Sequence, residues 1–501
     1  MFTASRINPE SIRSFLPMCL TALVGIFSIS MEAKPENPNI VVILADDLGY
    51  GDVQCLNPHS RIPTPAMDSL ATHGKKYIDA HSPSAVCTPT RYGLLTGRYC
   101  WRSRLTRGVL NGYGSPLIEE GRQTVADHLK SAGYITGIIG KWHLGLDFAP
   151  SNNPEAKYDF SQPLKKSPIA FGFNYSRIIP ASLDFPPYVV VENSEITELP
   201  TARQEARKFP AFLRQGERSP DFIPEQILDR LTSLAVNFID DHANAEKPFF
   251  LYFPLTAPHK PVLPAERFRG LSGLGPYGDF ILQTDWTVGQ ILECLNKNKI
   301  TENTLVILTS DNGSFMYKNQ ANSEDHTSNV SLQSYNEDIH RSNFIFRGTK
   351  ADIYEAGHRV PFFVQWPARV RKSSVSNRTI CHVDIFATVA KLTGQPIAEG
   401  MAGDSVSFAR DLLDDPTSSK RPPVIHHSAN GTFAIREGDW KLILSDGSGG
   451  RENPKGAPFS EPFQLYNLSA DPRESDNLIN QHTDIANDLE RKLNTIRKAG
   501  K

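Results

Sequence analysis

Several apolar runs in this chain stop abruptly at polar residues that can carry chemistry. Short, continuous apolar runs are typical of strands buried on both faces of a sheet. Four such runs cover residues 39–45, 135–140, 249–254 and 304–309. The polar residues that follow them are Asp46 and Asp47, Lys141 to His143, His259, and Ser310 to Asn312. We predict four buried strands that present these side chains at their carboxyl ends.

Helical patterns separate the predicted strands. Apolar residues at helical spacing occur over 65–72, 124–132, 224–241 and 280–296. Alternating strands and helices predict an α/β fold with a mostly parallel central sheet that helices cover on both faces. Ligands of such sheets bind at the carboxyl ends of the strands. We therefore expect the four polar clusters to meet in one crevice. A strand over 360–366 and a helix over 383–393 would complete this domain.

The chain changes character near residue 415. The segment 414–423 (DDPTSSKRPP) is polar and rich in proline and serine, as linkers are. After it, 433–444 and 463–468 alternate like antiparallel strands, and 483–498 has the pattern of a charged amphipathic helix. These patterns predict a catalytic domain over 34–415 and a smaller C-terminal α+β domain over 416–501.

Two long stretches, 148–220 and 313–347, show no regular pattern and are polar or proline-rich. Long loops in a compact enzyme usually shape the substrate entrance, and we expect that role here.

Composition limits the classes of partner. The chain has 501 residues, of which 39% are hydrophobic, so a substantial core is expected. The formal net charge of −2 creates no overall field that would attract nucleic acid or an anionic membrane surface. We expect no nucleic-acid partner, and we expect any recognition of an anion to be local.

The N-terminus has the layout of a signal peptide. Arg6 and Arg13 precede an apolar run over 15–29, and small or polar residues follow it. The run is shorter than the ~20 apolar residues that span a bilayer. We predict a signal peptide over 1–33 and an exported protein, periplasmic or secreted, with no membrane insertion after the signal is removed. A retained membrane anchor is the alternative.

Cysteine usage does not define a disulfide framework. Of six cysteines, Cys19 lies in the predicted signal and Cys87 lies in the motif described next. The other four allow three pairings, and the sequence selects none of them. A chain of this length does not need disulfides to fold, so we interpret these four as structural or free: Cys55, Cys100, Cys294 and Cys381.

The stretch 87–98 (CTPTRYGLLTGR) points to a nucleophile precursor. Pro89 suits the first turn of a helix, which places Cys87 at or just before a helix N-terminus. Free backbone N–H groups and the positive helix end attract anions there, and Arg91 adds a permanent charge. The alternative for Cys87 is a buried, inert cysteine at a helix start.

Two acidic pairs at two predicted strand ends indicate a metal site. Asp46 and Asp47, with Asp311 and Asn312, supply only hard oxygen donors, which suit Ca²⁺ or Mg²⁺ and suit zinc poorly. The alternative is that the aspartates cap turns and that Asn312 begins a plain turn or a glycosylation sequon. Two pairs beside the Cys87 motif favour the metal.

The Cys87 stretch resembles the signature of the formylglycine-dependent sulfatases of the arylsulfatase type, in which the cysteine is oxidised after translation to formylglycine. The resemblance runs from Asn39 to about Asn467 and includes the segments DDLGYGD (46–52), GKWHLG (140–145), APHKP (257–261), SDNG (310–313) and RGTKADIYEAGHRVP (347–361). It implies the alkaline-phosphatase-like fold, an α/β/α sandwich with a smaller C-terminal domain.

The resemblance also implies roles for residues. The ligands of Ca²⁺, with Mg²⁺ the less favoured ion, would be Asp46, Asp47, Asp311, Asn312 and an oxygen of the modified Cys87. The sulfate oxygens and the developing charge would be neutralised by the metal with Arg91, Lys141 and Lys350.

The implied chemistry uses both hydroxyls of hydrated formylglycine. One would attack sulfur, with Asp311 as proton acceptor, and His259 with Lys350 would assist the departing alcohol. His143 would then take a proton from the second hydroxyl, which expels sulfate. The family usually has two glycines after the glutamate of the lysine segment. This chain has Glu355, Ala356 and Gly357, which puts the position of Lys350 in question.

The sequence therefore predicts a sulfuric ester hydrolase that releases an alcohol and inorganic sulfate. The alternatives are a phosphoester or phosphonate hydrolase of the same superfamily, and a secreted, non-catalytic protein that binds sulfated glycans. The resemblance implies a formylglycine-generating enzyme as maturation partner and a sulfated small molecule or glycan as substrate. Aryl, glycosaminoglycan and algal polysaccharide sulfates all remain open, because specificity lies in the loops.

Overall fold

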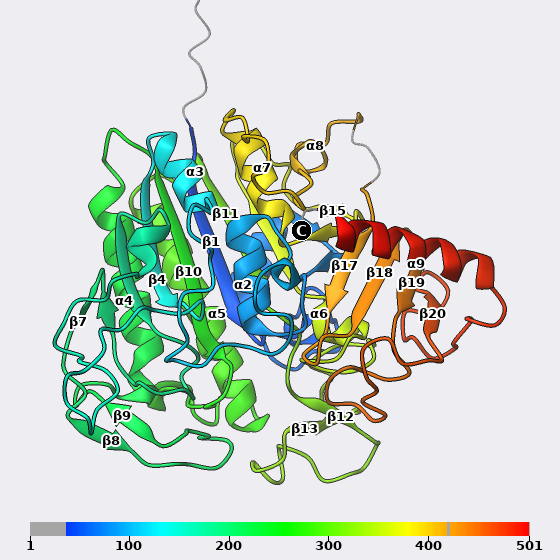
Figure 1. Ribbon diagram of the computed structural model, residues 1–501, viewed down its shortest axis with the longest axis horizontal. Coiled ribbons are helices and arrows are strands. Elements are labelled where there is room, and N and C mark those ends of the chain that lie inside the picture. The colour runs from blue at the N-terminus through cyan, green and yellow to red at the C-terminus, as the bar shows by residue number, and fades with distance from the viewer. Residues whose placement is uncertain (1–36, 418–420, 500–501) are drawn as a thin grey trace, which may run out of the picture. The chain divides into compact units, whose positions relative to one another are not determined.

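The computed structural model describes residues 37–417 and 421–499, which all belong to one compact unit (Figure 1). The predicted signal peptide, residues 1–33, lies outside the described residues. The predicted boundary between two domains near residue 415 stays a prediction.

A ten-stranded, mostly parallel sheet forms the centre of this unit. Five neighbouring strands run parallel in the order β11, β1, β10, β4, β5. They are β1 (Asn39–Asp46), β4 (Ile135–Lys141), β5 (Tyr175–Ile179), β10 (Phe249–Pro258) and β11 (Thr304–Ser310). One edge continues with β14 (Phe362–Gln365), β2 (Lys75–Tyr77) and β15 (Ser374–Ser376), and the other with β6 (Val191–Glu192) and β7 (Glu195–Ile196).

Helices cover both faces of the sheet, as predicted for an α/β fold. One face packs against α1 (Pro65–His73), α4 (Pro224–His242) and α5 (Gly275–Lys297). The other packs against α2 (Cys87–Thr96), α3 (Val125–Ser131), α7 (Asp384–Leu392) and α8 (Ala409–Leu412). Alternate residues of β1 enter the two cores, and every residue of β10 and β11 is buried. Burial on both faces explains why these strands are continuous apolar runs.

Part of the stretch 148–220 is regular, contrary to the prediction. Its YSRII segment is the strand β5, which is short and begins with Tyr175, Ser176 and Arg177, and it therefore lacks the apolar run of its neighbours. Small paired strands also occur in both long stretches. They are β8 (Ala202–Gln204) with β9 (Gly216–Arg218), and β12 (Tyr317–Asn319) with β13 (Ser334–Asn336).

The C-terminal region forms the predicted α+β arrangement. Its antiparallel sheet has the order β17 (Val424–His427), β18 (Phe433–Glu437), β19 (Trp440–Ile443), β20 (Gln464–Asn467). The helix α9 (Thr483–Lys498), red in Figure 1, lies against β18 and β19 and buries Leu489 and Leu493 there. The strand β17 was not predicted. The remaining elements are β3 (Ala80–His81), β16 (Ile380–Cys381), α6 (Glu355–His358) and 3-10 turns at Tyr50–Asp52, Cys100–Arg102, Pro168–Phe171 and Glu266–Phe268.

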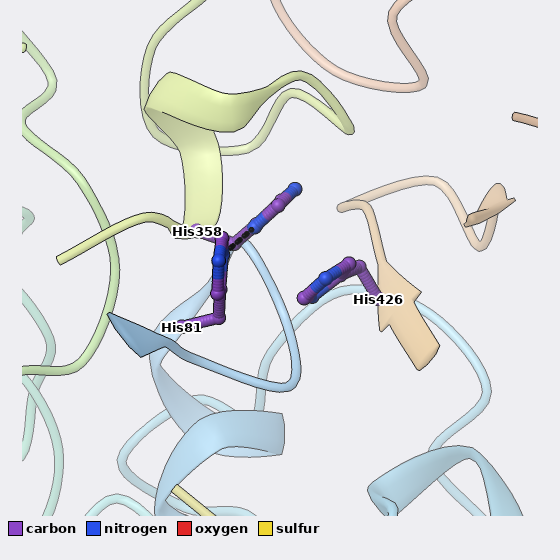
Figure 2. Close-up of side chains that lie close together, drawn as sticks. All are labelled: His81, His358 and His426. Carbon is purple, nitrogen blue, oxygen red and sulfur yellow. Dashed lines mark hydrogen bonds between the residues drawn. The ribbon is translucent and has the colours of Figure 1, made fainter. Parts of the chain in front are cut away.

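Three buried histidines join this sheet to the rest of the unit (Figure 2). His81 and His358 share a hydrogen bond of 3.1 Å between their Nδ1 atoms, and the rings of His358 and His426 stack at 3.8 Å with an angle of 9°. A ligating imidazole directs its lone pair in the plane of the ring, so two stacked rings cannot both point at one ion. Lys441 also lies 3.0 Å from His358 Nε2. We interpret His81, His358 and His426 as a structural contact held by hydrogen bonds and ring stacking, and we call them the buried histidine joint.

No helix in the described part of the chain is both long and apolar enough to cross a membrane. The five cysteines within it are free.

Candidate active site

The carboxyl ends of the parallel strands bring the predicted site residues together. Asp46 is the last residue of β1, and Lys141 is the last residue of β4. Asp311 and Asn312 follow β11, and His259 follows β10. Because β11, β1, β10 and β4 are neighbours in the sheet, their polar tips meet in one place.

The helix α2 presents Cys87 to these tips. Cys87 is the first residue of α2, and Pro89 lies in its first turn. Gly97, with φ 62°, caps the C-terminus of this helix. All ten residues of α2 are buried, and the Cys87 side chain is 2% exposed. Burial raises the pKa of the Cys87 thiol to about 12. The thiol is therefore protonated at neutral pH.

Three cations and three carboxylates form buried pairs around Cys87. Lys141 Nζ lies 2.8 Å from both oxygens of Asp46. Lys350 Nζ lies 2.6 Å and 2.8 Å from the oxygens of Asp47, and it lies 3.4 Å from Cys87 Sγ. The third pair joins Arg91 Nη2 to Asp311 Oδ2 at 2.7 Å. Pairing of this kind is what makes buried charges tolerable.

Neighbouring charges favour the ionised forms of Asp47, Lys350 and Arg91. Burial disfavours the Asp47 carboxylate, yet His259 and Lys350 hold its pKa below its ordinary value. Burial also disfavours the charged forms of Lys350 and Arg91. The neighbouring negative groups together outweigh that effect, with Asp47 the largest contributor for Lys350 and Asp311 for Arg91, so both pKa values lie above the ordinary ones. The site is therefore an array of fixed charges.

The donor atoms fit a hard cation. Ligand atoms of Asp46, Asp47, Cys87 and His259 all lie within 4.8 Å of one another. Asn312 Nδ2 donates to Asp47 Oδ1 at 2.6 Å, whereas Asn312 Oδ1 is buried and has no hydrogen-bond partner among the described residues. An orphaned amide oxygen among carboxylates is the donor set that Ca²⁺ and Mg²⁺ prefer.

Two site residues have left-handed backbone conformations. Asp47 has φ 68° and His143 has φ 57°. Such values are uncommon outside glycine and concentrate at functional sites, where the surrounding structure holds them.

Burial lowers the pKa of both predicted catalytic histidines. His143 Nε2 donates to the Leu110 carbonyl at 2.8 Å, so its Nδ1 carries a lone pair. That Nδ1 atom is buried, and no described residue bonds to it. Burial, reinforced by Lys141 and Arg91, holds the pKa of His143 well below its ordinary value. Burial lowers the pKa of His259 to about 3, although its Nε2 lies 3.5 Å from Asp47 Oδ2.

Gly140 allows β4 to approach β10 closely beside the site. It has φ 135°, and a Cβ atom at this position would lie 1.9 Å from the Pro254 carbonyl oxygen. This approach fixes where Lys141 and His143 emerge from the sheet.

The departure from the family pattern at Ala356 does not remove Lys350 from the site, because Lys350 contacts both Asp47 and Cys87. Gly357 is the glycine that this turn needs. A Cβ atom there would lie 1.9 Å from the Asp352 carbonyl oxygen.

Two residues at the edge of the site were not predicted from the sequence. Asp184 is 2% exposed and pairs with Arg214, and its Oδ1 has no hydrogen-bond partner in the described part of the chain. The negative charge of Asp184 also raises the pKa of His259, against the larger lowering effect of burial. The neighbouring Phe185 ring lies 5.9 Å from the His143 ring. The signal for both was the short run SRIIP, whose strand β5 ends just before them.

Comparison with known proteins identifies the class. Residues 38–395 match the Sulfatase family, and residues 349–499 match the family described as N-sulphoglucosamine sulphohydrolase, C-terminal. The chain belongs to the sulfatase family and is a sulfuric ester hydrolase.

Two relatives cover most of the chain. It is 36% identical to an N-acetylgalactosamine-6-O-sulfatase of Bacteroides thetaiotaomicron, over 92% of this chain and 93% of the relative. It is 31% identical to human arylsulfatase A, over 89% of this chain and 84% of the relative.

A solved structure agrees with these relatives. A sulfatase structure from work on glycosaminoglycan metabolism by Bacteroides thetaiotaomicron is 35% identical, with a TM-score of 0.79 over 92% of this chain and 99% of that protein.

Proposed function

We propose that this sulfatase acts on a carbohydrate sulfate through a formylglycine made from Cys87, with Ca²⁺ beside it. The observation that carries the proposal is the position of Cys87 at the helix start, within 4.8 Å of ligand atoms of Asp46, Asp47 and His259. Lys350 Nζ lies 3.4 Å from Cys87 Sγ. An inert packing cysteine has no need of this polar surrounding.

The proposed metal ligands are side chains that already meet in the site. They are Asp46, Asp47, Asp311, Asn312 and an oxygen on residue 87. Ca²⁺ supplies positive charge that favours the bound sulfate and lowers the pKa of a hydroxyl on residue 87. Mg²⁺ is the alternative ion.

Lys141, Arg91 and Lys350 are proposed to hold the sulfate oxygens. Each is buried and already oriented by a carboxylate, so little reorganisation is needed when negative charge develops. Electrostatic preorganisation of this kind usually contributes more to the rate enhancement than any other single effect.

The two histidines suit opposite proton transfers. His143 Nδ1 has a free lone pair, so it can accept the proton of the second hydroxyl. His259 is proposed to protonate the departing alcohol, with Lys350 beside it. Its protonated form is disfavoured by burial and by the nearby lysines, and an anionic ester in the site would counter the effect of those lysines. Asp311 is the proposed acceptor for the attacking hydroxyl.

The edge of the site favours a carbohydrate leaving group. Asp184 offers a buried carboxylate oxygen without a partner among the described residues. A sugar hydroxyl or amide N–H would satisfy it, whereas a plain aryl ring would leave it unpaired. The Bacteroides thetaiotaomicron relative is named for a sulfated amino sugar, which supports the same class of substrate.

Mass spectrometry of the peptide that contains Cys87 tests the proposal. Conversion of the thiol to the aldehyde lowers the peptide mass by about 18 Da. Protein co-expressed with a formylglycine-generating enzyme should show this loss and hydrolyse sulfate esters. Cys87→Ala should remove both signals and retain the fold. Cys294→Ala, a buried cysteine remote from the site, is the matched control. An active protein with an unmodified thiol would contradict the proposal.

A further measurement separates the sulfatase from the phosphoester hydrolase. Parallel turnover of an aryl sulfate and the matching aryl phosphate should favour the sulfate. Preference for the phosphate would instead support the phosphoester hydrolase.

We also propose that residues 1–33 direct export, and the N-terminal sequence of the protein recovered outside the cytoplasm checks this.

A further inference from the structure

A pocket of about 800 Å³ opens beside the active site. Its lining comes from residues 111–114 and 155–160, from the β8–β9 segment at 200–217, and from Pro186. All of it lies outside the motifs that the family match explains. Its volume falls within the range of sites that bind small molecules, ~300–1,000 Å³.

Two chain segments connect the pocket lining to the catalytic residues. The Leu110 carbonyl accepts from His143 Nε2 at 2.8 Å, and the Leu110 N–H donates to Thr88 Oγ1 at 3.2 Å. Asn111, the next residue, lines the pocket. On the other side Phe185 lies against His143, and the next residue, Pro186, lines the pocket. On each wall, the first lining residue thus follows directly in the chain after a residue that contacts His143.

The walls are held together before any ligand binds. Gly112 approaches the second wall so closely that a Cβ atom would lie 2.1 Å from the Pro186 carbonyl oxygen. The Tyr113 hydroxyl donates to Glu217 across the pocket. A preformed pocket lowers the entropy that a ligand loses on binding.

The chemistry of the lining fits a sugar. The rings of Tyr113 and Tyr158 stack at 5.7 Å with an angle of 6°, and Phe160 lies beside Tyr158 at 6.3 Å. Both tyrosines are half-buried and line the pocket. Aromatic rings with a few polar groups around them bind the apolar faces and hydroxyls of small polar molecules.

The charges of the lining are balanced, which selects among saccharides. The acidic residues are Glu155 and Glu217, and the basic residues are Lys157 and Arg203. Lys157 Nζ lies 5.0 Å from the centre of the Tyr158 ring, and Arg203 pairs with Glu205 at 3.8 Å. A polyanionic chain would require an excess of cations. Arg102, one of the arginines that follow the Cys87 motif, is already paired with Asp404.

We propose that this pocket binds an uncharged sugar residue linked to the sulfated sugar, so that the substrate is an oligosaccharide and not a single sulfated unit. The inference rests on the proposed function, because the sulfated sugar must occupy the site beside Cys87. It assigns Tyr113 and Tyr158 as the platform for the second sugar.

Kinetics with paired substrates test this subsite. The probes are 6-O-sulfated N-acetylgalactosamine alone and the same sugar linked on either side to uncharged galactose. We expect the converted wild-type enzyme to have the higher kcat/KM for one disaccharide. Tyr158→Ala should lower the ratio of disaccharide to monosaccharide kcat/KM by about 10-fold, the upper end of the contribution of one ring contact. If the alanine variant fails to fold, Tyr158→Leu replaces it. This variant keeps an apolar side chain and should also lower the ratio of disaccharide to monosaccharide kcat/KM.

The matched control is Tyr317→Ala. Tyr317 is 37% exposed on β12 and lies outside the pocket lining, so the ratio should not change. Equal kcat/KM for monosaccharide and disaccharides in the wild type would overturn the proposal. So would an unchanged ratio in both Tyr158 variants, or a preference for a disaccharide that carries a uronate in place of galactose.

A binding measurement separates this inference from the proposed function. If the converted enzyme hydrolyses none of the probes, the proposed substrate is wrong. Calorimetry with Cys87→Ala and the uncharged disaccharide lactose then decides the subsite alone. Binding that Tyr158→Ala removes would support it, and no binding would overturn it.

Discussion

At the scale of single residues, the active site is a set of matched charges. Asp46, Asp47 and Asp311 each have a cationic partner within 2.8 Å, Arg91 also lies 3.6 Å from Asp46, and all six side chains are buried. Removal of one partner from a buried pair leaves an uncompensated charge, which destabilises proteins by ~3–5 kcal/mol. Catalytic and structural effects of a substitution here are therefore linked.

Lys141→Ala should show both effects. We expect activity to fall by at least ~10²-fold, because a preorganised charge at the sulfate is lost. The free energy of unfolding in chelator should fall by ~3 kcal/mol, because Asp46 loses its nearer cationic partner and keeps only Arg91, at 3.6 Å. Urea unfolding and aryl sulfate turnover measure the two effects. Lys166→Ala, in an exposed pair with Glu120, should change neither noticeably. Retained stability in Lys141→Ala would mean that the ion pair contributes little.

Asn312→Ala should raise the Ca²⁺ requirement. The substitution removes the orphaned Oδ1 atom and leaves the carboxylates in place. Perturbed metal sites commonly lose affinity by ~10–100-fold, and we expect a shift of about that size in the Ca²⁺ concentration for half-maximal activity. Titration of chelator-treated enzyme measures it. Asn298→Ala, remote from the site, is the control. An unchanged Ca²⁺ requirement would remove Asn312 from the proposed ligand set.

At the scale of elements, sequence patterns were reliable where local burial decides the structure. The strands β1, β4, β10 and β11 are continuous apolar runs because both of their faces are covered, and the residues after them could be assigned for that reason.

The strand β5 and the pocket lined by Tyr113 and Tyr158 were missed for the opposite reason. The strand is short and only its last two residues are aliphatic, and the pocket forms only when segments distant in the sequence pack together. Local periodicity carries no signal for such contacts.

Gly140→Ala should disturb the contact between β4 and β10. Its backbone conformation is unfavourable for alanine, and the added Cβ would meet the Pro254 carbonyl oxygen at 1.9 Å. We expect a loss of more than ~2 kcal/mol in the free energy of unfolding, together with reduced activity, because Lys141 and His143 follow directly. Gly133→Ala is the matched control. It also has positive φ, but nothing lies within 4 Å of the added Cβ. Its cost should be limited to the conformational strain, ~1–2 kcal/mol, with normal activity. Equal effects in the two variants would contradict this account.

At the scale of the whole molecule, the buried histidine joint makes stability depend on pH. Burial lowers the pKa of His81, His358 and His426 below the ordinary value of 6.5. As pH falls below 6.5, the unfolded chain therefore takes up protons that the folded protein does not. Nearby Glu474 acts in the opposite direction, because burial raises its pKa to about 7 and the folded state binds its proton first. Asp79, Glu355, Lys441 and Arg436 complete the cluster.

Three histidine protons outweigh one glutamate proton, so stability should fall between pH 6.5 and 5. Each uncompensated proton contributes up to ~1.4 kcal/mol per pH unit. Urea unfolding at pH 7, 6 and 5 measures the slope. His426→Phe keeps an aromatic ring for stacking and should reduce the slope by about one proton. His59→Asn, at an exposed position, should leave it unchanged. Stability that rises toward pH 5 would contradict the expectation.

The complete burial of α2 also determines when Cys87 can be converted to formylglycine. A second enzyme that oxidises Cys87 cannot reach a thiol that is 2% exposed within a helix whose residues are all covered. Under the proposed function, conversion must precede folding, so each molecule becomes active or permanently inactive while it is being made. Folded protein that was never converted should gain no aldehyde when it is incubated with the converting enzyme. The same chain kept unfolded in that incubation should gain it.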